Sequence, residues 1–288
     1  MAKTREIRRR IRSIEKTRQI TKTMEMIATS KLKRASDRVA AARPYAQRLA
    51  DVIGRLLDPE LRERYPILRQ PAQARRAAVI LLTSNRGQAG AFNVNLIREA
   101  RALQERLRAE GTEPELYVVG RKGISFFRFQ KVAMAATRTD ITDRPTAADA
   151  SSLVEPLVAR FESGELDAVY VVYAQFRSAL STPPAVMRVL PVEAPVQQRQ
   201  GPALNYILSP SADEILTRLL PLYVRNMVYR ALVETAAAEQ GARRTAMKNA
   251  TDNAGEMLDT LRRQYNRLRQ AAITQEIAEI VGGAAALE

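Results

Sequence analysis

The chain has 288 residues, of which 46% are apolar, and it carries a formal net charge of +15 without any cysteine or histidine. Such a length supports a sizeable core and one or two domains. The lack of cysteine excludes disulfides, thiol nucleophiles and thiolate metal sites, and the lack of histidine removes the commonest general base and metal ligand. Carboxylate or lysine catalysis stays open, but the composition favours a non-catalytic protein.

No targeting or membrane-spanning segment is expected. The N-terminus, Met1 to Lys16, is charged, and the apolar stretch of a signal peptide does not follow it. The longest apolar run, Ala77 to Leu82, is far shorter than the ~20 residues that span a bilayer. We expect a soluble or peripheral chain.

A long helix is expected over residues 1–57. All 14 prolines lie between Pro44 and Pro221, so both ends of the chain lack this helix breaker. Apolar residues near the N-terminus recur at steps of three and four, which predicts one buried helix face with a phase slip after its third member. These residues are Ile7, Ile11, Ile14, Ile20, Met24, Ile27, Leu32, Ala35 and Val39.

The positive charge of the chain is concentrated in this helix. Residues 1–48 hold 15 Lys and Arg against 4 Asp and Glu, a balance of +11, whereas residues 211–288 hold 10 of each sign. The N-terminal segment should therefore bind an anionic partner, and nucleic acid, anionic lipid and an acidic protein surface all remain open.

The middle of the chain, residues 75–195, is predicted to form a small α/β domain. Short apolar runs alternate there with segments of helical periodicity, which is typical of a parallel sheet covered by helices. Strands are expected at 77–83, 115–119 and 168–173, with a further candidate at 186–192, and helices at 93–109 and 149–162.

A second long helix is expected over residues 211–288. Ser211 and Glu214 form a capping-box pattern at its start, and Gly282-Gly283 should end it near Val281. At about 1.5 Å per residue the helix would be roughly 100 Å long, which is too long for a compact domain. Its small residues favour an antiparallel pair with the N-terminal helix, and two separate helices of a larger bundle are the alternative.

Two constellations suggest chemistry, and both have plainer explanations. The segment 84–90 follows a strand and precedes a helix, where a phosphate loop would lie, but it lacks the glycine spacing of a dinucleotide site and the Gly-Lys-Ser/Thr of a P-loop. Gly87 and Gly90 are better explained as turn glycines. Glu276 and Glu279 lie three apart on one helix face, and such a pair at a helix terminus is usually solvated.

Segments along the whole chain resemble the γ subunit of F-type ATP synthases. The helix 20–28 (ITKTMEMIA) and the loop 83–87 (TSNRG) are similar to that family's opening helix and first central loop. The segments 246–253 and 265–271 are similar to its last helix, and the motif at 273–276 (ITQE) to its C-terminal signature. Two departures occur, since Asn85 stands where Asp is common and Gln88-Ala89 replace a common Leu-Cys. Without cysteine, the thiol switch of the chloroplast branch is excluded.

The resemblance implies an α/β fold in which a long antiparallel coiled coil of the N- and C-terminal helices joins a small Rossmann-like α/β domain. It implies a rotor shaft that stands inside a hexamer of α and β subunits, with the ε subunit and the membrane c ring at its foot. Catalysis would belong to β, so this chain would be no enzyme and would hold no cofactor or metal. It would lie at the cytoplasmic face of the bacterial plasma membrane and touch the membrane only through the ring.

The resemblance also assigns contact residues. Met24 matches a position that faces an acidic lever on β, which the +11 segment suits because charge attraction does not require a locked shape. Four positions of the C-terminal helix match further β contacts, namely Arg243, Gln270, Thr274 and Glu276. Tyr206 matches a foot residue near ε and the c ring. No catalytic residue is expected.

Two rival functions remain open from the residues alone. A basic helical nucleic-acid-binding protein would bind DNA or RNA with a steep salt dependence. A nucleotide-dependent enzyme of the α/β domain would bind a dinucleotide or turn over substrate by itself. The resemblance implies neither, and it implies that nucleic acid is not a partner.

Overall fold

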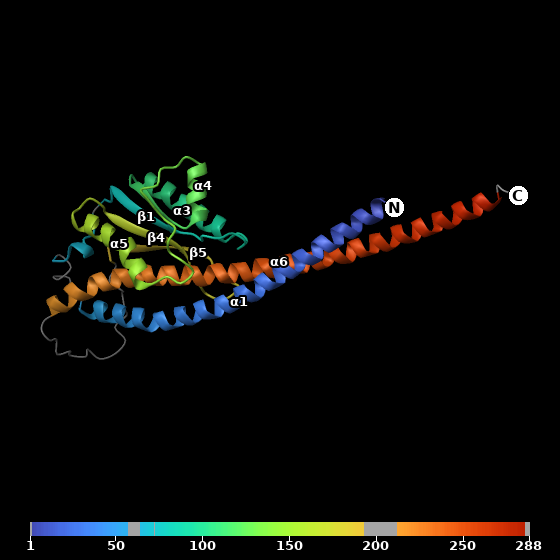
Figure 1. The fold of residues 1–288 in the computed structure, drawn as a ribbon. Coiled ribbons are helices and arrows are strands. Elements are labelled where there is room, and N and C mark those ends of the chain that lie inside the picture. The colour runs from blue at the N-terminus through green and yellow to red at the C-terminus, as the bar shows by residue number, and fades with distance from the viewer. Residues whose placement is uncertain (1, 57–63, 72, 193–211, 286–288) are drawn as a thin grey trace. The chain divides into compact units, whose positions relative to one another are not determined.

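The computed structural model describes residues 2–56, 64–71, 73–192 and 212–285 (Figure 1). The chain divides into two compact units, one of residues 1–28 with 243–288 and one of residues 29–242. The helices α1 (Ala2–Leu56) and α6 (Ala212–Ala285) contribute residues to both units. The expected helix cap at Ser211 lies outside the described residues.

The unit of residues 1–28 and 243–288 is an antiparallel pair of helices. Thr251 Oγ1 donates a 2.8 Å hydrogen bond to Thr21 Oγ1, and Arg262 forms a 2.8 Å ion pair with Glu15. The partner on α6 moves toward the C-terminus as the residue on α1 moves toward the N-terminus, so the two helices run in opposite directions, as Figure 1 shows. The predicted fold class, a coiled coil of the terminal helices plus an α/β domain, is confirmed.

The α1 side of this helix pair follows heptad spacing. Ile14, Thr21 and Ala28 are spaced by seven residues, and each is buried or half-buried. The sequence pattern placed Ile20 and Ile27 on the buried face, but their side chains are 59% and 52% exposed. That prediction was wrong because a polar residue, Thr21, occupies the seam and satisfies its hydroxyl across it. The apolar residues alone therefore indicated a phase slip between Ile14 and Ile20, whereas the buried positions of the helix keep a regular heptad spacing.

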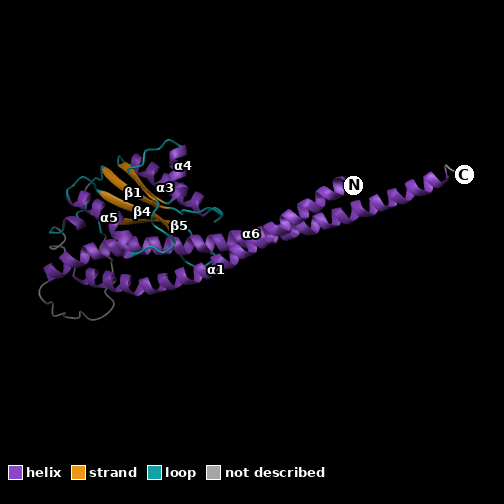
Figure 2. Cartoon of the chain, in the orientation of Figure 1, coloured by secondary structure: helices purple, strands orange, loops and turns teal. Residues whose placement is uncertain are grey.

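A five-stranded sheet forms the centre of the unit of residues 29–242 (Figure 2). Its order is β3-β2-β1-β4-β5, with β5 antiparallel to β4 and all other neighbours parallel. The strands are β1 (Arg76–Leu82), β2 (Glu113–Val119), β3 (Ala136–Arg138), β4 (Ala168–Ala174) and β5 (Pro184–Leu190). The order of the parallel strands is that of a Rossmann half, in which each crossover brings the chain back so that the next strand runs parallel to the last.

Helices bury both faces of this sheet. On one face lie α3 (Phe92–Ala109) and α4 (Arg121–Phe129), and on the other lie α5 (Ala147–Glu162), the short η1 (Pro66–Leu68) and the first part of α6. Alternate residues of β1 point to the two sides, so that Ile80 packs with the second set and Leu81 with the first. Two-sided burial explains why β1 is a continuous apolar run rather than an alternating one.

The ends and breaks of the helices differ from expectation. α6 passes through Gly282 and Gly283 and ends at Ala285, so the stop predicted near Val281 is wrong. A glycine costs an interior helix position about 1 kcal/mol, which weakens a helix without forcing its end. The elements α4 and β3 were not expected from the sequence, because a segment of nine or three residues is too short to display a period.

Gly120 offers a sharp test of the connection between β2 and α4. Its φ is +98°, and an added Cβ would lie 2.1 Å from the carbonyl oxygen of Thr83. We expect Gly120→Ala to lower the free energy of unfolding by at least ~3 kcal/mol, because overpacking against backbone adds to the conformational strain. Urea denaturation followed by circular dichroism measures this loss.

Gly111 supplies the matched control. Its φ of +81° is similar, but the nearest atom to an added Cβ is a flexible side-chain atom of Gln73 at 3.7 Å. Gly111→Ala should therefore cost only about 1 kcal/mol, the strain of the left-handed backbone alone. Equal losses in the two variants would contradict the close approach at Gly120.

Candidate functional site

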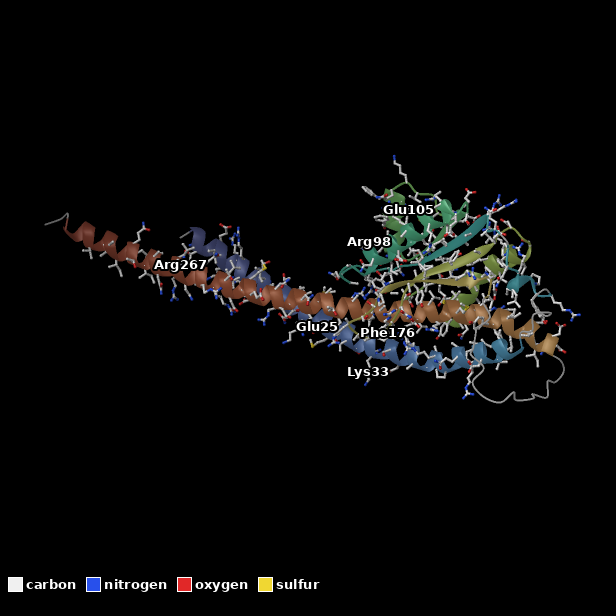
Figure 3. All side chains as sticks on the ribbon, turned by 180° about the vertical axis from the view of Figure 1, so that it is seen from behind. Glu25, Lys33, Arg98, Glu105, Phe176 and Arg267 are labelled. Atoms are coloured by element: carbon white, nitrogen blue, oxygen red, sulfur yellow. The ribbon has the colours of Figure 1, made fainter. Side chains whose placement is uncertain are left out.

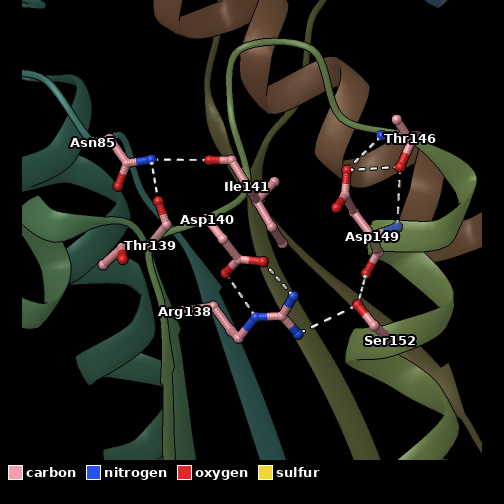
Figure 4. Close-up of polar contacts among 8 residues, drawn as sticks. All are labelled: Asn85, Arg138, Thr139, Asp140, Ile141, Thr146, Asp149 and Ser152. Carbon is pink, nitrogen blue, oxygen red and sulfur yellow. Dashed lines mark hydrogen bonds and ion pairs between the residues drawn. The ribbon is translucent and has the colours of Figure 1, made fainter.

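A side chain of the loop 84–90 holds the loop against neighbouring segments of the chain. Asn85 Nδ2 donates to the carbonyl oxygens of Thr139 at 3.0 Å and Ile141 at 2.9 Å, as Figure 4 shows, and Asn85 Oδ1 accepts from the Arg121 amide at 3.0 Å. The Asn85 amide is thus engaged at both ends and ties β1 to the segment that follows β3. This arrangement favours the turn explanation of the loop over a phosphate loop.

The segment after β3 is ordered by charge and by a helix cap. Arg138 binds Asp140 through Nε at 2.8 Å and Nη2 at 2.6 Å (Figure 4), and these hydrogen bonds lower the pKa of Asp140 to about 2. Thr146 and Asp149 exchange side-chain and backbone hydrogen bonds in a capping box at the start of α5. Both features order the chain between β3 and α5.

A buried carboxylate fixes α6 to the end of β4. Glu234 is 1% exposed, accepts a 3.2 Å hydrogen bond from the Phe176 amide and pairs with Arg230 at 2.7 Å. The next residue, Thr235, accepts from the Ala174 amide at 3.3 Å. Burial and the charge of Glu234 raise the pKa of Tyr173. The paired and hydrogen-bonded carboxylate is a packing device, since every oxygen already has a partner.

The part of α1 in the unit of residues 29–242 presents a basic face. Lys31 Nζ forms a 2.6 Å ion pair with Asp143, and this hydrogen bond lowers the pKa of the Asp143 carboxyl. Arg43 donates a 3.1 Å hydrogen bond to the carbonyl oxygen of Phe176. Figure 3 shows Lys33 on the side of α1 that faces away from the sheet. The basic surface expected near the N-terminus is therefore partly used to hold the α/β domain on α1.

The predicted contact residues fall into two regions of the helix pair. Met24 is half-buried one turn from the Thr21–Thr251 contact. Gln270, Thr274 and Glu276 are exposed on the last part of α6, about five to seven turns beyond Thr251. The Thr274 hydroxyl donates to the Gln270 carbonyl at 3.0 Å, so it is engaged with its own helix.

The remaining predicted contact residues are placed differently. Arg243 is only 8% exposed and has an interaction within the chain, so its side chain is not freely available at the surface. Tyr206 lies outside the described residues, and so does the side chain of Glu279. The roles of all these residues stay predictions.

The end of α6 exposes apolar side chains that the sequence interpretation did not single out. Ile273, Ile277 and Ile280 are 48%, 56% and 72% exposed. Near the start of α1, Arg8 Nη2 donates a 2.7 Å hydrogen bond to the Tyr265 hydroxyl, and Figure 1 shows α6 running past that start. Exposed apolar residues repeated at helical spacing mark an interaction surface. The steps of three and four were visible in the sequence, but the exposure of these side chains depends on tertiary packing that no local pattern encodes.

Within the described residues, no helix is at once long and apolar enough to cross a membrane. The described part of the chain also has no group of three or more acidic side chains gathered as a metal site would require.

Comparison with known sequences gives a match over the whole chain. A family model described as ATP synthase matches residues 3–287. A protein of Gemmatimonas aurantiaca called ATP synthase gamma chain is 61% identical over 289 residues, covering 100% of both chains. A protein of the same name from Desulfitobacterium hafniense is 46% identical over 289 residues, again with 100% coverage of both.

Solved structures share the fold at low sequence identity. A chain of the Euglena gracilis mitochondrial ATP synthase rotor in rotational state 1 is 20% identical, with a TM-score of 0.65, and the match covers 94% of this chain and 99% of that one. A chain from the rotational state 3 structure of the same enzyme has a TM-score of 0.69 at 20% identity, covering 99% and 95%. Two long terminal helices with a sheet domain are thus a known architecture.

The helix register can be tested by engineered cysteines, because the chain has none of its own. The hydroxyls of Thr21 and Thr251 lie 2.8 Å apart, which places the two Cβ atoms near disulfide range. We expect Thr21→Cys with Thr251→Cys to oxidise within one chain, seen as a faster, reductant-sensitive band on electrophoresis. Thr21→Cys with Thr274→Cys is the control and should give no such band. The opposite pattern would show that the register is wrong.

Proposed function

The chain belongs to the family of ATP synthase gamma chains, the central stalk of F-type ATP synthases, and we propose that it works as the rotor shaft of such an enzyme. It couples ion-driven rotation of a membrane c ring to the conformational cycling of catalytic β subunits, for ATP synthesis or hydrolysis. The chain itself is not a catalyst, and the chemistry belongs to β. Neither family membership nor fold supports the nucleic-acid-binding alternative.

One observation carries the proposal beyond family membership, namely that the end of α6 has no partner within the described chain for its apolar residues. A single amphipathic helix gains most of its stability from packing, so a surrounding partner must supply it. A sleeve formed by the α and β hexamer would do so. Contacts that recur at each catalytic site should not lock the shaft at one angle, and a narrow stripe such as Ile273 and Ile277 meets that requirement better than a broad apolar face.

We place the β contacts in the two regions already described. Met24 would face the acidic lever of β, from the helix that carries most of the chain's excess positive charge. Gln270, Thr274 and Glu276 would meet β near the tip of α6, where their exposure supports direct contact. Arg243 would act from its buried position on α6.

The remaining partners follow from the same role. The ε subunit and the c ring would bind at the foot, where Tyr206 is the expected contact. The assembly would hold the chain peripherally at the cytoplasmic face of the bacterial plasma membrane, with the ring as its only link to the bilayer.

Reconstitution tests the proposal. Purified α and β subunits are mixed with and without the full chain, and complex formation and ATP hydrolysis are measured by gel filtration and phosphate release. We expect the chain to join a stable complex and raise its ATPase activity while remaining inert alone. A chain that stays outside the complex and leaves its activity unchanged would refute the shaft role.

Met24→Lys tests the lever contact. The added cation should form a competing charge contact with the acidic lever, so we expect ion pumping per ATP hydrolysed to fall by roughly half or more in membrane vesicles containing the assembled enzyme. Met24→Leu is the isosteric control, and Met26→Lys, at a position 58% exposed on the same helix, controls for added charge. Unchanged coupling in Met24→Lys would remove Met24 from the contact.

A further inference from the structure

We propose that a basic cavity beside α1 binds an oxyanion of the size of inorganic phosphate. This proposal does not depend on the proposed shaft function. The cavity has a volume of about 170 Å³ and is lined by α1, by the loop before α5 and by α6. All the lining residues belong to the unit of residues 29–242. Sites for drug-sized ligands usually measure about 300–1,000 Å³, so this cavity suits a small anion rather than a whole nucleotide.

Positive charge dominates the lining. α1 supplies Lys31, Arg34 and Arg38 from neighbouring turns of one face, and the loop supplies Arg144. The acidic lining residue, Asp143, is already paired with Lys31 at 2.6 Å. Among the residues that the structure describes, no ion pair neutralises Arg34, Arg38 or Arg144. Arg34 Nη2 donates a 3.0 Å hydrogen bond to Ser30 Oγ, which leaves its other N–H groups and the guanidiniums of Arg38 and Arg144 for an anion.

Gln240 adds a neutral polar group from α6. It is only 3% exposed, and its side chain makes no hydrogen bond to another described residue. In the described part of the chain, no fully buried polar side-chain atom lacks a partner, so the Gln240 amide must reach the cavity that it lines. A nearly buried amide with no protein partner is uncommon, and it points to a ligand that accepts its hydrogen bond.

Phosphate fits this set of donors. Arginine forks bind tetrahedral oxyanions through paired N–H groups, and the glutamine amide can donate to a further oxygen. A merely solvated basic face would attract anions too, but without saturation and without dependence on the uncharged Gln240. The contribution of that residue therefore separates a built site from general electrostatic attraction.

The test is equilibrium dialysis of radiolabelled phosphate against the purified full chain at low ionic strength, because salt screens the interaction. We expect saturable binding of one phosphate per chain, with competition by sulfate. Arg34→Gln and Arg38→Gln should each weaken binding about tenfold, as expected for a lost charge-assisted hydrogen bond, and Gln240→Leu should weaken it about threefold. Asp143→Asn should instead strengthen binding about threefold, because it removes the one repelling carboxylate.

Lys33→Gln is the matched control, since Lys33 is exposed on the same stretch of α1 and does not line the cavity. It should change phosphate affinity less than about twofold. Circular dichroism of each variant verifies that the fold is intact. ATP as a second competitor identifies the source, since competition assigns the phosphate to a nucleotide and its absence to the free ion.

Unsaturable binding, or equal losses in Lys33→Gln and Arg34→Gln, would overturn the proposal, as would a Gln240→Leu variant with unchanged affinity. This binding is measured on the chain alone, whereas the shaft function is measured on the assembled complex. Failure of one therefore leaves the other untouched.

Discussion

The pairing of the two chain ends is the constraint that shapes the unit of residues 1–28 with 243–288. In the unit that contains them, only five described residues of α6 from position 243 onward are buried, namely Arg243, Met247, Thr251, Ala254 and Leu258. Their steps of four, four, three and four trace one narrow stripe. Small and polar residues in that stripe let the helices approach closely while burying little apolar area. At about 25 cal/mol per Å² of apolar area, so narrow a stripe stabilises the pair only modestly.

The unit of residues 29–242 has the opposite character. Its sheet is buried on both faces by two apolar clusters, and buried polar contacts such as Glu234 to the Phe176 amide fix α6 against the end of β4. One unit thus carries its own core, whereas the other exposes apolar residues at its tip and has few buried ones. Such a contrast suits a shaft, because the firmly packed part can be held by fixed partners and the sparsely packed part can meet partners that change.

Much of the fold was predictable because its signals are long or strongly apolar. The proline-free ends of the chain predicted α1 and α6, and the apolar run at residues 77–82 predicted β1. The errors have physical causes. The pattern predicts Ile20 to be buried between the two helices because an aliphatic residue is ordinarily buried. Thr21 takes that position instead, since its hydroxyl bonds to Thr251, which lies 230 residues away in sequence. The pair Gly282-Gly283 was expected to end the C-terminal helix, but glycine only lowers the stability of a helix.

The candidate site was less predictable than the fold. The resemblance named Arg243 as a contact, but its burial depends on tertiary packing that no local pattern encodes. The unpaired isoleucines of α6 were visible as a stripe, yet their exposure depends on where α1 begins relative to α6. The cavity around Gln240 joins residues from three separate segments, and only the folded chain brings them together.

Direct observation of rotation tests the central claim most closely. Because the chain has no cysteine, Phe129→Cys gives a single labelling site at a position 85% exposed on α4. A bead attached there is watched on α–β complexes fixed to a surface while ATP is supplied. The account predicts stepwise rotation in one direction that stops when ATP is removed. A bead that stays fixed while the same complexes hydrolyse ATP would contradict it.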